Sequence, residues 1–146
     1  TREIAAYGGL APKVPGFCAV FLVFTLSSIG LPLTNGFVGE FLLLLSGFRY
    51  NWLIGTIAVS GVVLGAMYML SLYRRVCFGA FDETKNGDLT DLTMREKLVF
   101  APLLILVFWM GLYPQYFLDK LRPSSDAVLA SLKESKLTSV IAANIK

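Results

Sequence analysis

Residues 26–45 have the sequence LSSIGLPLTNGFVGEFLLLL, in which two apolar segments flank a break and a single acid follows it. Residues 14–39 contain no charged side chain, and neither do residues 41–48, so Glu40 stands alone in a long apolar stretch. A charged side chain at the centre of a bilayer costs roughly 2.5–3.5 kcal/mol on insertion scales, and such residues mark proton and ion pathways. Glu40 is therefore the candidate proton-translocation residue of this stretch.

The break is built from Gly30, Pro32, Thr34, Asn35 and Gly36. Pro32 has no N–H to donate, and its ring collides with the carbonyl of the preceding helical turn. The short polar side chains of Thr34 and Asn35 can bond to backbone groups that the break frees, and Gly36 carries no Cβ penalty. Irregular backbone is tolerated at membrane depth only inside protein or beside a water-filled cavity. A broken helix next to an ionisable group is how transporters build ion sites.

The composition indicates an integral membrane protein. Of the 146 residues, 55% are hydrophobic and only 16% are charged, whereas soluble domains carry about one quarter charged residues. Histidine is absent, which excludes a histidine-based metal, haem or proton-relay site in this chain. Cys18 and Cys77 lie in or beside apolar stretches, so we expect small hydrophobic residues and no disulfide or metal site. The net charge of +3 reports membrane topology and does not indicate a nucleic-acid partner.

The fold class predicted is all-α, a polytopic transmembrane helix bundle with about three crossings, the first of them a discontinuous helix. The apolar segments on either side of the break are about 24 and 20 Å long at 1.5 Å per residue. A complete crossing needs about 20 residues, so one tilted crossing fits better, and two crossings with a tight reversal at Pro32 are the alternative. The expected segments are a surface loop at 1–13, a broken transmembrane helix at 14–50, a transmembrane helix at 51–78, a polar loop at 79–95, a transmembrane helix at 96–118 and a partly amphipathic C-terminal tail at 119–146.

Two smaller motifs give local expectations. Gly61 and Gly65 have the GxxxG spacing that lets two helices approach closely. Asp91 or Thr93 is expected to cap the helix that follows the polar loop, and Glu96 stands three residues after Thr93 as in a capping box.

Basic residues are distributed unequally between the two sides of a three-crossing topology. The positive-inside rule places the richer side in the cytoplasm or the mitochondrial matrix, which puts the N-terminal loop there and the C-terminus on the opposite side. The richer side has Arg2, Lys13, Arg74, Arg75, Lys85, Arg95 and Lys97, and the other has Arg49, Lys120 and Arg122 near the membrane, with Lys133, Lys136 and Lys146 further out.

Residues 30–41, GLPLTNGFVGEF, resemble the pattern GLPGTxxFxGEF of subunit 4, the M-type antiporter-like subunit of respiratory complex I, a proton-pumping NADH:quinone oxidoreductase. The similarity covers about residues 1–120 and corresponds to the C-terminal part of that subunit. This sequence departs from the pattern at Leu33, where the family commonly has glycine, and we expect the larger side chain to tighten the break. Further similar segments are Arg2 with Tyr7-Gly8-Gly9-Leu10, Tyr73-Arg74-Arg75 with Phe78-Gly79, Arg95-Glu96, and Met110-Gly111-Leu112-Tyr113-Pro114.

The resemblance implies that Glu40 is the intramembrane carboxylate of a proton half-channel, reached by water through the helix break. It implies a larger antiporter-like fold of about fourteen helices, of which this chain resembles the last three. The other membrane-arm subunits, including neighbouring antiporter-like subunits, and the lipid bilayer are the expected partners. A separate chain would carry the earlier helices if this sequence is complete. The expected location is the mitochondrial inner membrane or the bacterial cytoplasmic membrane.

No redox chemistry is expected in this chain. No motif for NADH, flavin, iron–sulfur clusters or quinone is present, so the resemblance places NADH, FMN, the clusters and quinone on other subunits. Two other functions remain open. A cation/proton antiporter subunit resembles this stretch but tends to carry lysine at position 40. A purely structural membrane subunit would use Glu40 as a static partner of the broken backbone or of a basic side chain.

Overall fold

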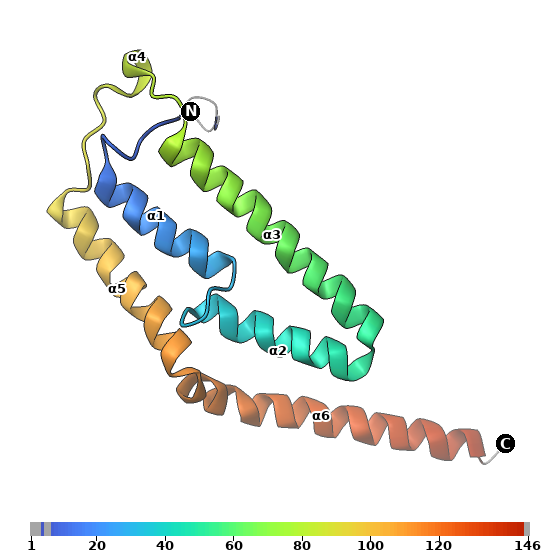
Figure 1. The fold of residues 1–146 in the computed structure, drawn as a ribbon. Coiled ribbons are helices and arrows are strands. Elements are labelled where there is room, and N and C mark those ends of the chain that lie inside the picture. The colour runs from blue at the N-terminus through green and yellow to red at the C-terminus, as the bar shows by residue number, and fades with distance from the viewer. Residues whose placement is uncertain (1–3, 5–6, 145–146) are drawn as a thin grey trace. The chain divides into compact units, whose positions relative to one another are not determined.

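The computed structural model describes residue 4 and residues 7–144, with side chains omitted at 85 and at 134–144, and that part of the chain is helical without any strand (Figure 1). The chain divides into two compact units, Thr1–Leu112 and Tyr113–Lys146. The first unit holds α1 (Pro15–Ser28), α2 (Asn35–Tyr50), α3 (Trp52–Phe78), α4 (Glu83–Asn86) and α5 (Met94–Leu112), and the second holds α6 (Pro114–Asn144).

The predicted interruption is present between α1 and α2. The two helices have 14 and 16 residues, so each is shorter than a full crossing. Figure 1 shows α2 leading away from the end of α1 in the same general direction, with α3 returning beside both. A tight reversal at Pro32 would instead lay α2 back along α1. The arrangement therefore favours one discontinuous helix over a hairpin.

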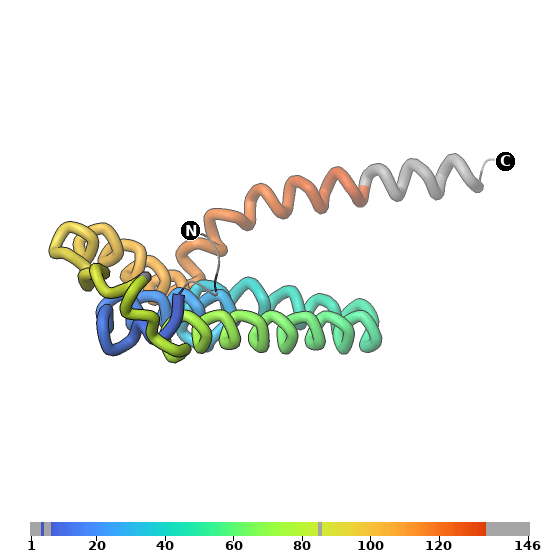
Figure 2. Tube along the Cα trace, turned by 90° about the horizontal axis from the view of Figure 1, so that it is seen from above, coloured from blue at the N-terminus to red at the C-terminus, as the bar shows by residue number. Residues whose placement is uncertain are grey.

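Helix α3 is the long partner of this discontinuous helix. Its 27 residues extend about 40 Å at 1.5 Å per residue, and it is the one described helix that is by itself long and apolar enough to cross a membrane. A second span is counted only if α5 and the start of α6 are taken together. Both views place α2 and α3 side by side in opposite directions (Figures 1 and 2).

The junction between α2 and α3 is a single residue, Asn51, in extended conformation, and its side chain accepts a hydrogen bond of 2.8 Å from the Leu53 amide. The helices approach closely just beyond it, because a Cβ placed on Gly47 would lie 3.5 Å from the Cα of Gly55. At Gly61, the first glycine of the GxxxG spacing, a Cβ would meet no atom of the described chain within 4 Å.

A small core closes the end of the first unit where the N-terminal loop meets the end of α3. Leu10 and Ala11 donate backbone hydrogen bonds to the carbonyls of Val76 and Cys77, at 3.3 and 3.0 Å. The core consists of Leu10, Val14, Cys18 and Cys77. Both cysteines are buried, as expected for small hydrophobic residues.

Helix α5 begins with the predicted capping box. The Thr93 amide donates to Glu96 Oε2 at 2.7 Å, and the Glu96 amide donates to Thr93 Oγ1 at 3.4 Å. Asp91, the alternative cap, is used elsewhere: its carboxylate accepts hydrogen bonds from the amides of Gly16 and Phe17 at the start of α1, at 2.9 and 3.0 Å. The helix ends at Leu112, earlier than the expected span 96–118, because the chain enters a new helix at Pro114.

The second unit is the helix α6, which covers the segment expected to be a partly amphipathic tail. Its apolar residues Val128, Leu129 and Leu132 are exposed, and Arg122 pairs with Asp119 at 3.3 Å one turn away. Lys146 and the preceding residue lie outside the described part of the chain.

Candidate functional site

Helix α1 ends in a Schellman motif that positions the candidate site. The Leu31 amide donates to the Leu26 carbonyl at 3.0 Å, and the Gly30 amide donates to the Ser27 carbonyl at 3.2 Å. Gly30 has a φ of +78°, the left-handed conformation that glycine adopts without a Cβ penalty. The motif satisfies carbonyls at the end of α1 that would otherwise remain unpaired.

The break itself is a short turn closed by Thr34. The Thr34 amide and hydroxyl both donate to the Leu31 carbonyl, at 3.1 and 2.6 Å, and Thr34 is fully buried. Leu33 also has a φ of +78°, and its side chain is 59% exposed. The expectation that Leu33 tightens the break was therefore wrong, because its side chain leaves the break while its backbone adopts a conformation suited to glycine.

Asn35 and Gly36, predicted as part of the break, form the first turn of α2. Ser27 Oγ donates to Asn35 Oδ1 at 2.6 Å, which joins the end of α1 to the start of α2 across the break. Gly36 lies directly against the Ser27 carbonyl, so that any Cβ at this position would collide with it. The two helix ends are thus held by one side-chain hydrogen bond and one glycine contact.

Glu40 reaches back along α2 to the break. Its Oε2 occupies the space that a Cβ on Gly30 would need, and the same Cβ would lie 3.0 Å from the Glu40 Cδ. Glu40 is half-buried. The sequence separately predicted the acid and Gly30, and the structure brings them into contact. Glycine is therefore needed at position 30 for two reasons: the backbone has a positive φ, and the Glu40 carboxylate fills the space that a Cβ would occupy.

A cavity of about 320 Å³ lies beside the Glu40 carboxylate. It is bounded by Ser28 and Ile29 at the end of α1, by Glu40, and by one face of α3. Among the described side chains, no hydrogen bond or ion pair holds the Glu40 carboxylate in place. A carboxylate beside such a space can exchange protons with water or with a group brought in by another helix.

Helix α5 contributes a contact that sequence analysis missed. Gly111 presses against the backbone of Leu33 and Thr34, so that a Cβ there would lie 2.6 Å from the Thr34 nitrogen. Ser27 was missed as well. In the sequence Ser27 is one of two adjacent serines in a stretch without charged residues. Only its hydrogen bond to Asn35 identifies it. The signal for Gly111 was its place in the family-like segment of the last helix, which does not reveal its partner.

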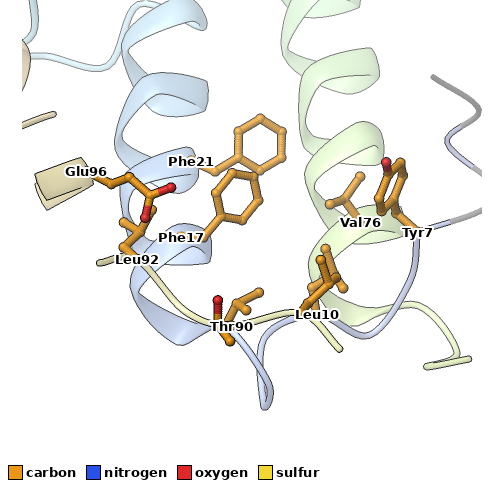
Figure 3. Close-up of a pocket in the computed structure, with 10 residues that line it drawn as sticks. Tyr7, Leu10, Phe17, Phe21, Val76, Thr90, Leu92 and Glu96 are labelled. Carbon is orange, nitrogen blue, oxygen red and sulfur yellow. The ribbon is translucent and has the colours of Figure 1, made fainter. Parts of the chain in front are cut away.

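A second cavity, of about 450 Å³, lies at the end of the unit where the N-terminal loop and the 87–93 segment meet (Figure 3). Its lining is mainly apolar, with Phe17 and Phe21 of α1 facing Val76 of α3. The Glu96 carboxylate at its edge is already bonded to Thr93. No residue of the break lines this cavity. Within the described residues no cluster of three or more acidic, histidine or cysteine side chains could hold a metal ion.

An interrupted helix with an acid folded back against its break, lying between two further apolar helices, is the arrangement expected of antiporter-like membrane subunits. Residues 1–67 match the family described as NADH:quinone oxidoreductase/Mrp antiporter, transmembrane.

Individual relatives narrow this class. The chain is 48% identical to NADH-quinone oxidoreductase subunit M of Rhodobacter capsulatus and 45% identical to NADH-ubiquinone oxidoreductase chain 4 of Marchantia polymorpha, each over 124 residues and 85% of this chain. This similarity to subunit M and chain 4 proteins confirms the resemblance found in the sequence. It spans about a quarter of the relatives' length, 24% and 25% respectively.

The fold has a solved counterpart. The structure described as respiratory complex I from Thermus thermophilus with bound NADH contains a chain that is 33% identical to this one, with a TM-score of 0.70. The match covers 86% of this chain and 26% of that one.

Proposed function

We propose that this chain forms part of a proton-translocating membrane-arm subunit of NADH:quinone oxidoreductase, with Glu40 as an intramembrane proton carrier. One observation carries the proposal: the Glu40 carboxylate is folded against Gly30 at the helix break and borders a cavity. The similarity of the chain to subunit M and chain 4 proteins supports the assignment to this enzyme.

In the proposed mechanism Glu40 takes up a proton from water in the cavity and releases it when the local charge changes. Gly30 leaves room for the carboxylate, and the hydrogen bonds around Ser27 and Thr34 hold the broken backbone that positions it. A positive side chain on a neighbouring helix would favour the ionised form, and its withdrawal would favour the protonated form. The energy comes from redox chemistry on other subunits, to which the proposal assigns NADH, FMN, iron–sulfur clusters and quinone.

The proposed partners are the other membrane-arm subunits, including neighbouring antiporter-like subunits, and the polypeptide that carries the remainder of the fold. The proposed location is the mitochondrial inner membrane or the bacterial cytoplasmic membrane. The positive-inside rule places the N-terminal loop on the matrix or cytoplasmic side and the C-terminus on the other side.

Two alternatives are weaker on specific grounds. A cation/proton antiporter subunit would be expected to carry lysine where this chain has Glu40. A structural subunit would use the acid as a fixed partner, yet among the described side chains no hydrogen bond or ion pair fixes its carboxylate.

The test is Glu40→Gln in the assembled complex, which keeps the side-chain volume and removes the titratable group. NADH-driven proton translocation in sealed vesicles should fall on the order of tenfold or more, since proton transfer by a positioned side chain typically contributes about 10²–10⁴-fold. Asp88→Asn, at an exposed acid in the loop after α3, is the matched control and should pump normally. Normal pumping by an assembled Glu40→Gln complex would show that Glu40 is structural.

A further inference from the structure

The cavity beside Glu40 has an unusual wall on α3. Four of its α3 residues, Ala58, Gly61, Gly65 and Ala66, have a methyl group or no side chain at all. A Cβ on Gly61 would meet nothing within 4 Å, and one on Gly65 would meet only a ring carbon of Tyr68, at 3.8 Å. Where glycines allow two helices to pack closely, the neighbouring helix fills the space that a Cβ would occupy. Here the missing side chains leave the volume in front of the carboxylate open.

The break, in contrast, is closed on the side of α5. Gly111 lies against the backbone of Leu33 and Thr34, and Gly36 lies against the Ser27 carbonyl. Thr34 is 1% exposed, and its hydroxyl is already bonded to Leu31. Three exposed side chains of the break, Leu31, Pro32 and Leu33, offer water no hydrogen bond. Asn35 is also exposed, but its Oδ1 already accepts a hydrogen bond from Ser27 Oγ.

Polar groups surround the cavity at more than one point. Besides the Glu40 carboxylate, its lining includes the hydroxyls of Ser28 and Tyr68. A buried water needs two to four polar partners and occupies roughly 30 Å³ in the liquid, so a cavity of about 320 Å³ has room for several waters in contact with these groups.

We infer that water reaches Glu40 across the small-residue face of α3 and not through the helix break, and that Gly61 and Gly65 keep this path open. The role of the path in pumping rests on the proposed function, whereas its hydration does not. The GxxxG spacing thus serves access to the acid, while Gly47 and Gly55 provide the close approach of α2 and α3.

Hydration is tested by cysteine labelling in the complete, assembled complex. Gly61→Cys and Val63→Cys are compared in a background in which Cys18 and Cys77 are replaced by serine, using methanethiosulfonate ethylammonium as an aqueous probe. Val63 lies on α3 outside the cavity lining. Cys at 61 should react about tenfold faster or more, because the thiolate is the reactive species and apolar surroundings disfavour it. Equal or slower labelling at 61 would overturn the inference.

Function is tested with Gly61→Leu, which fills the cavity, against Gly61→Ala and Val63→Leu. NADH-driven proton translocation should fall several-fold in Gly61→Leu alone, with oxidation of NADH by an artificial acceptor unchanged. Normal pumping by Gly61→Leu, together with loss of pumping in Glu40→Gln, would overturn the α3 path and leave the proposed function intact. Normal pumping by Glu40→Gln would overturn the proposed function, and the labelling result would still decide whether the cavity is hydrated.

Discussion

Leu33 and Gly30 share a φ of +78°, yet only one of them is glycine. A non-glycine residue in the left-handed region costs roughly 1–2 kcal/mol, and strain of this kind is concentrated at functional sites. The half-exposed Leu33 side chain provides little burial to offset it. The family pattern places glycine at this position, which agrees with the conformation found here.

Leu33→Gly should therefore be more stable than Leu33→Ala, by about 1 kcal/mol, because the two variants lose the same leucine contacts and differ in the penalty for positive φ. The measurement is thermal unfolding of the purified complex or of the full subunit in detergent. Leu33→Ala serves as the control for side-chain loss. Equal stability of the two variants would mean that the backbone at Leu33 carries no strain.

Among the elements, α1 depends on a residue far away in the sequence for its N-terminus. The carboxylate of Asp91 accepts hydrogen bonds from the Gly16 and Phe17 amides, and a carboxylate there also complements the helix dipole. Hydrogen bonds from the backbone amides of Leu92, Gly16 and Phe17 hold the pKa of the Asp91 carboxyl below its usual value. This contact ties the loop after α3 to the start of the broken helix.

Asp91→Asn should lower the thermal stability of the subunit at neutral pH. Because the pKa of Asp91 is depressed in the folded state, its contribution is complete above the usual carboxyl pKa of about 4 and is lost as the pH falls through the folded value. The difference in Tm between wild type and Asp91→Asn should thus be constant from pH 7 to about pH 5 and shrink below about pH 4. Asp88→Asn, in the same loop, should not show this pH dependence. A difference that grows on acidification would contradict the assignment.

The sequence predicted the helices and the break well, because both follow from local chemistry. The charge-free stretches predicted the helices, and Pro32 predicted the interruption between α1 and α2. The spacing of Thr93 and Glu96 predicted the capping box of α5. The sequence could not predict contacts between distant residues. It offered Asp91 as a cap for the nearer helix, and it gave no reason to pair Gly111 with Leu33, because which backbone a glycine approaches is decided by tertiary packing.

At the scale of the whole molecule, the described helices expose far more apolar surface than a soluble protein does. On α3 alone, Ile57, Leu64 and Met67 are each more than 60% exposed. Contiguous exposed apolar surface of this kind marks a membrane or protein interface. The chain covers about a quarter of its relatives' length, so lipid and the remainder of the fold are the partners expected on these faces.

The two ends of the first unit should face opposite sides of the membrane. The N-terminal loop is bonded to the end of α3, and Asp91 is bonded to the start of α1, so both loops lie at one end, while the α2–α3 junction lies at the other (Figure 1). Arg74, Arg75 and Lys97 lie at the end that carries the loops, and the positive-inside rule therefore predicts that this end faces the cytoplasm or matrix.

Membrane-impermeant maleimide should therefore label Asp88→Cys only from the cytoplasmic or matrix side of sealed vesicles, and Tyr50→Cys only from the opposite side. Both positions are exposed, and the native cysteines are buried, so the background should be low. Labelling of both positions from one side would require α1–α2 or α3 to re-enter the membrane without crossing it. Labelling of each from the side opposite to the expected one would keep the crossing and reverse the orientation, which would show that the basic residues near α3 and α5 do not determine it.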